Sequence, residues 1–204
     1  MEKLIATDKT PSRISGTLIK ELDENDRKIL SMLSENPGIS QAELSEALKI
    51  SQPAVSLRIR KLEEKGVLAH LVGTDIRKSE LFLAKVDITT NQVDQLLKAL
   101  EKCPLYLNCF LTSGKHNMTC LMLGENVKSI MSCVDARLRQ NLPAENIEFD
   151  LIVTPTKPMV VPIKPQTDRK KISPCGADCS VCNFYTGDKC LGCPGSVYYK
   201  GKLL

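Results

Sequence analysis

Hydrophobic residues change their spacing along this chain, and that change limits the folds available to it. Between residues 22 and 68 they recur at helical spacing, whereas from 80 to 154 strand-like runs alternate with helical segments. We therefore expect an α+β protein with a helical domain over 22–75 and a separate mixed domain over 80–154. A short tail over 1–21 precedes them.

Composition places the chain among ordinary soluble proteins. Its 204 residues are 42% hydrophobic and 25% charged, which is enough to bury one or two small cores. The first residues contain no apolar run of signal-peptide length, and nowhere do about eighteen apolar residues follow one another without a charge. We expect a cytoplasmic protein that does not contact a membrane.

The net charge of +4 is unevenly distributed. Residues 155–204 hold eight lysines and arginines against three acidic residues, whereas the preceding residues are nearly balanced. Overall charge therefore gives no reason to expect nucleic-acid binding. Any such prediction must rest on where individual basic residues lie.

Three helices are predicted between 22 and 68 from their start and stop signals. Asp23 begins the first helix, and the Asn-Pro-Gly sequence at 36–38 ends it. Ser40 begins the second helix with a capping box. Ser51 caps the third helix, whose first turn tolerates a proline. The whole unit reads as a compact three-helix domain.

The third helix, at about 51–64, has two unlike faces. Val55, Ile59 and Leu62 fall in one narrow sector at about 100° per residue and must face the core. The opposite side carries polar and basic residues around an apolar Leu57. Two helices joined by a short connection, the second of them basic, have the form of a helix-turn-helix whose second helix enters a major groove. A small bundle with a solvated basic face is the alternative.

Eight residues of this helix are predicted to contact DNA, some at the bases and others at the phosphates. Gln52 and Ser56 can reach base edges, and Leu57 suits contact with a thymine methyl group. The arginines and the lysine mainly hold phosphates. The predicted contacts are Ser51, Gln52, Pro53, Ser56, Leu57, Arg58, Arg60 and Lys61.

The segment from 80 to 154 carries strand and helix signals in the order βαββαβ. That order predicts a ferredoxin-like sheet with two helices on one face. The other face of such a sheet stays open, and two copies commonly bury these faces against each other. We expect a homodimer, or an oligomer of such dimers.

A set of residues in the helical domain keeps a recognisable order and spacing over about fifty positions: Leu22, Asp23, Asp26, Ile29, Leu30, Leu44, Ser51, Arg58, Ile59, Leu62, Glu63, Gly66 and Val67. This pattern resembles the DNA-binding domain of the Lrp/AsnC (leucine-responsive, feast/famine) transcription regulators. The resemblance implies a winged or plain helix-turn-helix that binds double-stranded DNA as a dimer. It also implies a following βαββαβ domain for effector binding and dimerisation, so that it covers about two thirds of the chain.

The resemblance further implies a small-molecule site near the connection between the second and third strands, at Gly114, His116 and Asn117. The family often has an acidic residue where this chain has Asn117, which argues against amino-acid sensing there. We expect His116 to be an exposed turn residue rather than a ligand.

Four of the nine cysteines lie in the mixed domain without ligand spacing: Cys103, Cys109, Cys120 and Cys133. Cys109 and Cys120 fall within apolar strands, where cysteine usually serves as a small core hydrophobe. We assign none of the four a chemical role.

The other five cysteines lie within nineteen residues, at 175–193, with the spacing C-x3-C-x2-C-x7-C-x2-C. A proline-rich, basic linker at 155–171 precedes them and should run extended over the surface as a spacer. Because thiols stay reduced in the cytoplasm, we expect a metal-binding lobe over 172–204 rather than a disulfide framework. The family resemblance does not extend to this lobe.

Two kinds of metal centre suit this spacing. The iron–sulfur interpretation uses Cys175, Cys179 and Cys182 with either Cys190 or Cys193, the last of which precedes a proline as in bacterial ferredoxins. The zinc interpretation uses the two C-x2-C pairs and leaves Cys175 aside, although its seven-residue loop is short. A [4Fe-4S] cluster is favoured, with zinc as the alternative and a bare thiol switch as a third interpretation.

Together these parts predict a DNA-binding transcription regulator, not an enzyme, that senses redox state, oxygen or iron through its cluster. Siroheme decarboxylases resemble the same two-domain architecture, but the chain has only His70 and His116 as histidines to handle tetrapyrrole carboxylates. An electron carrier tethered to DNA is a third class, for which an intact helix-turn-helix has no evident use.

Overall fold

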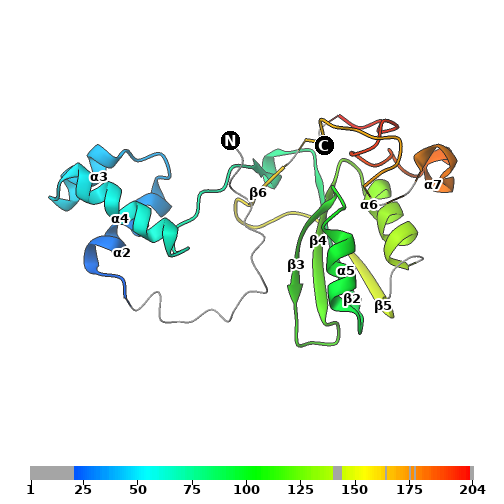
Figure 1. The fold of residues 1–204 in the computed structure, drawn as a ribbon, viewed down its shortest axis with the longest axis horizontal. Coiled ribbons are helices and arrows are strands. Elements are labelled where there is room, and N and C mark those ends of the chain that lie inside the picture. The colour runs from blue at the N-terminus through cyan, green and yellow to red at the C-terminus, as the bar shows by residue number, and fades with distance from the viewer. Residues whose placement is uncertain (1–20, 140–143, 164, 175, 177, 203–204) are drawn as a thin grey trace. The chain divides into compact units, whose positions relative to one another are not determined.

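The computed structural model describes residues 21–139, 144–163, 165–174, 176 and 178–202 (Figure 1). The chain divides into two compact units, Met1–His70 and Leu71–Leu204, and each is described by itself. Most of the tail expected over 1–21 lies outside the described residues. None of the described helices is long and apolar enough to cross a membrane.

The first unit contains the three helices that the sequence predicts. They are α2 (Glu24–Glu35), α3 (Gln41–Leu48) and α4 (Gln52–Glu64). The side chains of Asp23, Ser40 and Ser51 accept hydrogen bonds from backbone N–H groups at the three helix starts, and the first two form complete capping boxes. The predicted caps are therefore confirmed.

The core of the first unit is formed by side chains of α2, α3 and α4. Ile29, Leu44 and Val55 are fully buried, and Leu62 is 2% exposed. Ile59 is half-buried and packs against this cluster. The predicted inward sector of α4 is confirmed, because its apolar residues recur every three to four positions and so share one side of the helix.

The second unit is built on a four-stranded antiparallel sheet with strand order β3-β4-β2-β5. Its elements follow the predicted βαββαβ order: β2 (Phe82–Thr89), α5 (Val93–Leu100), β3 (Tyr106–Leu111), β4 (Met118–Gly124), α6 (Val127–Cys133) and β5 (Asn146–Ile152). After Cys133 the helix continues as a π-helix, η2 (Val134–Arg139). The predicted ferredoxin-like order is confirmed.

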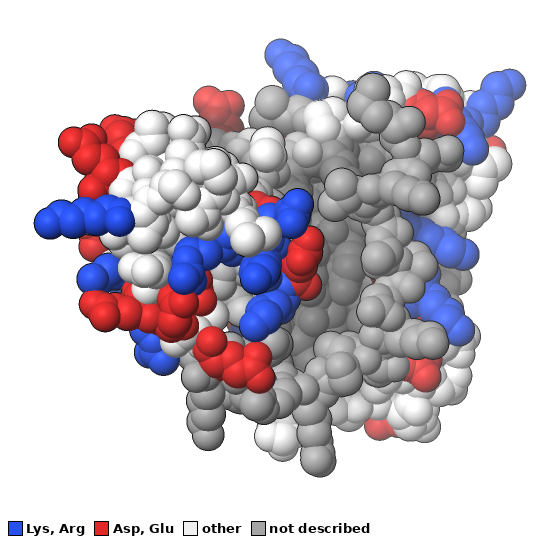
Figure 2. Space-filling view, turned by 60° about the vertical axis from the view of Figure 1, so that its left-hand side comes forward, with Lys and Arg blue, Asp and Glu red and all other residues white. Residues whose placement is uncertain are grey.

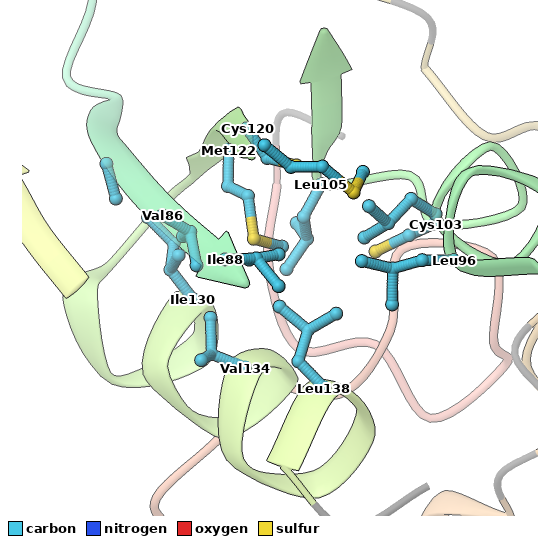
Figure 3. Close-up of a cluster of buried hydrophobic side chains, with 13 residues drawn as sticks. Val86, Ile88, Leu96, Cys103, Leu105, Cys120, Met122, Ile130, Val134 and Leu138 are labelled. Carbon is cyan, nitrogen blue, oxygen red and sulfur yellow. The ribbon is translucent and has the colours of Figure 1, made fainter. Parts of the chain in front are cut away.

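Both helices cover the same face of the sheet, as Figure 1 shows. The strand register places Val86 opposite Cys120 and Ile88 opposite Met118, and all four side chains are fully buried. Figure 3 shows Val86 and Ile88 on the same side as Ile130 of α6 and Val134 of η2, which belong to the same buried cluster. This layer is the main core of the unit, because alternate residues of each strand point to the helix side.

A short two-stranded ladder joins the start of the second unit to the proline-rich linker. β1 (Thr74–Asp75) pairs with β6 (Val160–Val161), and the Ile76 N–H donates to the carbonyl oxygen of Met159 at 2.9 Å. Val161 is 5% exposed. Within the linker expected to run over the surface at 155–171, residues 160–161 instead form a strand in which Val161 is buried, and residues 71–75 fall in the second unit rather than in a helical domain over 22–75.

The C-terminal lobe is compact and made of short elements. It contains a 3-10 turn, η3 (Cys179–Val181), and one helical turn, α7 (Asn183–Thr186), and single bridges pair Lys170 with Ser196 and Ile172 with Asp178. Ser196 is fully buried. Arg169 lies over the Tyr199 ring at 5.1 Å from its centroid, so the basic end of the linker contacts the lobe.

We predict that the ladder between β1 and β6 depends on Gly73. A Cβ atom at this position would lie 2.1 Å from the Val161 carbonyl oxygen. Gly73→Ala should therefore separate the strands and lower the free energy of unfolding of the second unit by about 1–3 kcal/mol, the usual cost of overpacking. Urea unfolding measures the cost, and amide exchange at Ile76 reports the ladder.

The control is Gly114→Ala, because nothing lies within 4 Å of a Cβ atom there. Equal exchange at Ile76 in the two variants would contradict the prediction.

Candidate nucleic-acid interface and candidate thiol site

The outer side of α4 presents most of the residues predicted to contact DNA. Leu57 is 43% exposed, although it is apolar. Four polar or proline neighbours on the same side are exposed as well, namely Pro53, Ser56, Arg60 and Lys61, and so are Ser51 and Gln52 at the helix start. Because the helix buries Val55 and Leu62 on its other side, this face is held outward by the core of the unit.

Arg58 is placed differently from the other seven. Its Nη1 atom lies 2.6 Å from Asp23 Oδ2 and 2.7 Å from Asp26 Oδ1, the two carboxylates of the α2 capping box. These carboxylates raise the pKa of Arg58, and the pKa of Asp23 is lowered by the Asp26 backbone N–H and then by Arg58. Arg58 thus fixes α4 to the start of α2, where the sequence led us to expect a phosphate contact.

The charge around the interface is mixed. Arg60 Nε lies 3.6 Å from Glu64 Oε1 one turn away, and both side chains are about two thirds exposed, at 68% and 67%. Such exposed pairs contribute little and can rearrange when a stronger anion approaches. Figure 2 shows basic and acidic side chains interspersed on the visible face of this unit, as the balanced composition of the unit predicts.

The predicted effector residues lie in and beside the β3–β4 connection and make structural contacts. Asn117 Nδ2 donates to the Thr90 carbonyl oxygen at 2.6 Å, and the Thr90 N–H donates to Asn117 Oδ1 at 3.0 Å. His116 is 8% exposed, so the expectation of an exposed turn residue is wrong. Its Nδ1 atom lies 3.1 Å from Thr89 Oγ1. Its Nε2 atom lies 3.2 Å from Glu148 Oε1 without hydrogen-bond geometry.

Effector binding by Gly114, His116 and Asn117 stays a prediction. Asn117 and His116 tie the connection to the end of β2, which gives both residues a role in the fold. Gly114 faces open space.

Four cysteines of the C-terminal lobe line one cavity of about 80 Å³, together with Cys103 and Cys133 of the sheet domain. The lobe contributes Cys179, Cys182, Cys190 and Cys193. Burial raises the pKa of the Cys190 thiol, and the Gly192 N–H donates to its sulfur at 3.4 Å. Cys175, the first cysteine of the predicted set, lies outside the described residues.

Helix α6 holds the lobe against the sheet domain on both sides of Cys190. Ser132 Oγ donates to the Lys189 carbonyl oxygen at 2.9 Å, and the Leu191 N–H donates to Ser129 Oγ at 3.0 Å. The two serines lie three residues apart on one side of the helix, so they can contact one extended segment.

A second contact fixes the end of the chain. Tyr199 Oη donates to Glu125 Oε1 at 2.6 Å, and the Lys202 N–H donates to the same carboxylate at 2.8 Å. The lobe is therefore docked on the sheet domain rather than tethered to it by the linker alone.

The thiols of the lobe fit a metal centre in their chemistry and only in part in their geometry. Two C-x2-C pairs open onto one cavity, and an N–H donor to a cysteine sulfur is a usual partner of a thiolate ligand. Among the described residues, however, no three Cys, His, Asp or Glu side chains are arranged to hold a metal ion.

Comparisons with known proteins address the first two thirds of the chain. A family model for winged helix-turn-helix DNA-binding domains matches residues 22–69. An uncharacterized HTH-type transcriptional regulator of Pyrococcus abyssi is 30% identical over 136 residues, which are 62% of this chain and 84% of that protein. The leucine-responsive regulatory protein of Rhizobium meliloti is 28% identical over 144 residues, 67% of this chain and 92% of that protein.

Solved structures give the same fold. Escherichia coli AsnC aligns with a TM-score of 0.58 at 15% identity, over 68% of this chain and 97% of its own. A transcriptional regulator of Neisseria meningitidis, solved as a complex with L-Met, aligns with a TM-score of 0.60 at 20% identity, over 67% of this chain and 92% of its own.

The chain belongs to the Lrp/AsnC family of helix-turn-helix transcription regulators. These relatives are named as regulators, in agreement with the expectation that the chain is not an enzyme. Each match leaves about a third of this Lrp/AsnC-type protein uncovered, so the cysteine-rich lobe draws no support from them.

Sequence reasoning missed two residues of the thiol site in this Lrp/AsnC-type protein. Cys103 and Cys133 were assigned no chemical role, yet their sulfur atoms lie 3.5 Å apart on the wall of the cavity. One signal was available: Cys103 follows α5 and Cys133 ends α6, and both helices cover the same face of the sheet.

We predict that Arg58 stabilises the helical unit in a pH-dependent way. The pKa of Asp23 is lowered in the folded state. Ionised Asp23 therefore stabilises the folded unit above the ordinary aspartate pKa of about 3.9, and this stabilisation is lost as the pH falls through the lowered pKa. Arg58→Met should lower the thermal midpoint of α-helix unfolding at pH 7, and the difference from the wild type should shrink below about pH 4. Circular dichroism measures both.

Arg60→Met is the matched control, because it removes an exposed arginine of the same helix and should change the midpoint little. A pH-independent deficit in Arg58→Met would show that the ion pairs do not explain its effect.

Proposed function

We propose that this Lrp/AsnC-type regulator binds double-stranded DNA as a homodimer through the outer face of α4. The observation that carries the proposal is the exposure of Leu57 at 43% among polar and basic side chains on one side of a capped helix. The described residues of its unit leave close to half of this apolar side chain exposed at the middle of the face. A thymine methyl group is a suitable partner.

The residues of the face divide into base contacts and phosphate contacts. Gln52 and Ser56 lie near the helix start, which enters the groove first in this class of domain, and both can reach base edges. Arg60 and Lys61 lie further along and hold phosphates, which sets affinity more than sequence choice. Arg58 instead holds α4 in position through its ion pairs with Asp23 and Asp26.

The homodimer is supported by the sheet domain. Its helix-free face carries Phe110, which is 50% exposed and lies opposite Thr119 in the register. Ile76 and Val161 pack against Leu83 and Leu123 at one end of this face, but Phe110 lies outside that cluster, and an exposed apolar side chain on a sheet face favours association with a second copy. A two-fold dimer places two recognition helices on half-sites about one helical turn, or a multiple of it, apart.

We predict different effects for the two kinds of contact. Arg60→Ala should weaken binding to every DNA sequence and reduce the slope of log affinity against log salt by about one, because one phosphate contact is lost. Gln52→Ala should cost about 1–3 kcal/mol on the preferred operator and less on other sequences. Operator fragments selected with the wild-type protein and titrated at several salt concentrations provide the measurement.

Lys28→Ala serves as a charge-matched control, because Lys28 lies on α2 and pairs with Glu24 at 2.7 Å. Wild-type affinity and salt slope in both α4 variants, with the dimer intact, would refute the assignment of this face.

We also propose that the C-terminal lobe binds a [4Fe-4S] cluster through Cys175, Cys179 and Cys182 with Cys190 or Cys193. Support comes from the spacing of the five cysteines and from the cavity onto which four of them open. When bound, the cluster would supply one-electron redox chemistry and sensitivity to oxygen. The Gly192 N–H beside Cys190 would then favour the thiolate form of that ligand.

Zinc is the second candidate, and the spacing of the lobe cysteines favours it. Both C-x2-C pairs open onto the cavity, and two such pairs are sufficient for a tetrahedral zinc site. In either case metal binding would add folding free energy to the contacts with Ser129, Ser132 and Glu125 that hold the lobe on the sheet domain.

We predict that anaerobically purified protein contains iron and sulfide in near-equal amounts and absorbs broadly in the visible range, with bleaching in air. Metal and sulfide analysis of protein from iron-replete cells measures this. Cys175→Ser should remove or weaken an iron–sulfur cluster but leave zinc binding intact. Cys109→Ser, outside the cavity, is the control for any cysteine substitution. Stoichiometric zinc without iron in all three proteins would decide for the zinc site.

A further inference from the structure

Two cysteines outside the metal-binding lobe face each other across neighbouring strands. Cys109 of β3 and Cys120 of β4 are Cα partners in the antiparallel register, and their sulfur atoms lie 3.1 Å apart. Both are free thiols. Residues directly opposite each other in such a ladder point to the same side of the sheet, so the contact is built into the register rather than made by chance.

The backbone at this pair already satisfies the needs of a disulfide. Opposite residues in antiparallel strands have Cα atoms about 4.5 or 5.5 Å apart. Both values fall within the range of about 4.4–6.8 Å found in disulfides. Bond formation between Cys109 and Cys120 therefore requires rotation of the side chains and no rearrangement of the strands.

The two thiols differ in access and in acidity. Cys120 is fully buried in the core of the sheet domain, whereas Cys109 is half-buried on β3, the edge strand. The hydrogen bond from the Cys120 thiol lowers the pKa of Cys109, and the same bond raises the pKa of Cys120. An accessible sulfur with more thiolate character beside a buried thiol is the arrangement of an attacking and a resolving cysteine.

We propose that Cys109 and Cys120 form a dithiol site that hydroperoxides oxidise to an intramolecular disulfide, with Cys109 as the attacking residue. The Cys109 thiolate attacks hydrogen peroxide, the O–O bond breaks, and Cys109 sulfenic acid and hydroxide form. The Cys120 thiol then attacks the sulfenic sulfur, a sulfur–sulfur bond forms, and water leaves. In total the two cysteines lose two electrons, and hydrogen peroxide gains them. One peroxide becomes two waters once the hydroxide has taken up a proton.

This site is separate from the cavity of the lobe. Cys109 and Cys120 are absent from the cavity lining, which holds Cys103 and Cys133 instead. The proposal therefore stands whether or not the lobe binds a metal. Oxidation would pin β3 to β4 beside the register irregularity between Tyr106 and Asn108, and so would fix the edge of the sheet.

Peptide mapping of the full-length protein tests the proposal, because Lys115 lies between the two cysteines. Trypsin releases residues 103–115 and 116–128 as separate peptides, and Cys133 falls in a third, 129–137. The protein is treated with limiting hydrogen peroxide, blocked with iodoacetamide in denaturant and digested without reductant. We expect the 103–115 peptide to be linked to 116–128, with fragmentation placing the bond at Cys109.

Two variants separate the roles of the sulfurs. Cys120→Ser should abolish the linked peptide and leave Cys109 as a sulfenic acid that dimedone labels, whereas Cys133→Ser should leave the link intact. A link from 103–115 to 129–137 in place of the expected one would overturn the proposal. The proposal would also be overturned if dimedone failed to label Cys109 in Cys120→Ser under conditions that oxidise cysteines of the lobe. Metal analysis of the same samples shows whether the lobe contained a metal. A failure of the cluster proposal can therefore be distinguished from a failure of the dithiol proposal.

Discussion

Helix α6 is packed on two sides, and the arrangement of the second unit depends on it. Ile130 on its inner side and Val134, the first residue of the following η2, are buried against the sheet, at 0% and 1% exposure. Its other side offers Ser129 and Ser132 to the backbone on either side of Cys190. The hydrophobic contact fixes the helix, and the fixed helix positions the lobe. Any change that loosened α6 from the sheet would therefore move the thiol site as well.

The ladder between β1 and β6 joins two parts of the second unit that are far apart in the sequence. β1 directly follows the segment that leaves the first unit, and β6 lies on the chain that leads to the lobe. Because the two strands are hydrogen-bonded, the ladder holds the beginning of the second unit against the segment that leads to the lobe.

Local signals predicted the regular elements, and contacts distant in sequence escaped prediction. Spacing within a few residues was sufficient to predict the inward sector of α4 and the helix caps at Asp23, Ser40 and Ser51. The pairing of Thr74 with Val161 joins two-residue strands far apart in the chain, too short for any periodic signal. The burial of His116 likewise depends on β5, which supplies Glu148 from across the sheet. Arg58 looked like its neighbours because charge alone does not reveal which basic side chain has a partner within the fold.

The cysteines show the same division between pattern and geometry. Ligand spacing singled out the five at the end of the chain and set aside the four in the sheet domain, since a spacing rule sees only neighbours in sequence. The fold brings those four together as two pairs, one on the cavity wall and one across β3 and β4. The second pair depends on the exact register, in which Cys109 faces Cys120, and a shift of one residue in the predicted hairpin would have placed them apart. Disulfide formation requires a second sulfur nearby. In this protein the strand register places Cys120 beside Cys109, although the two are not neighbours in a C-x2-C motif.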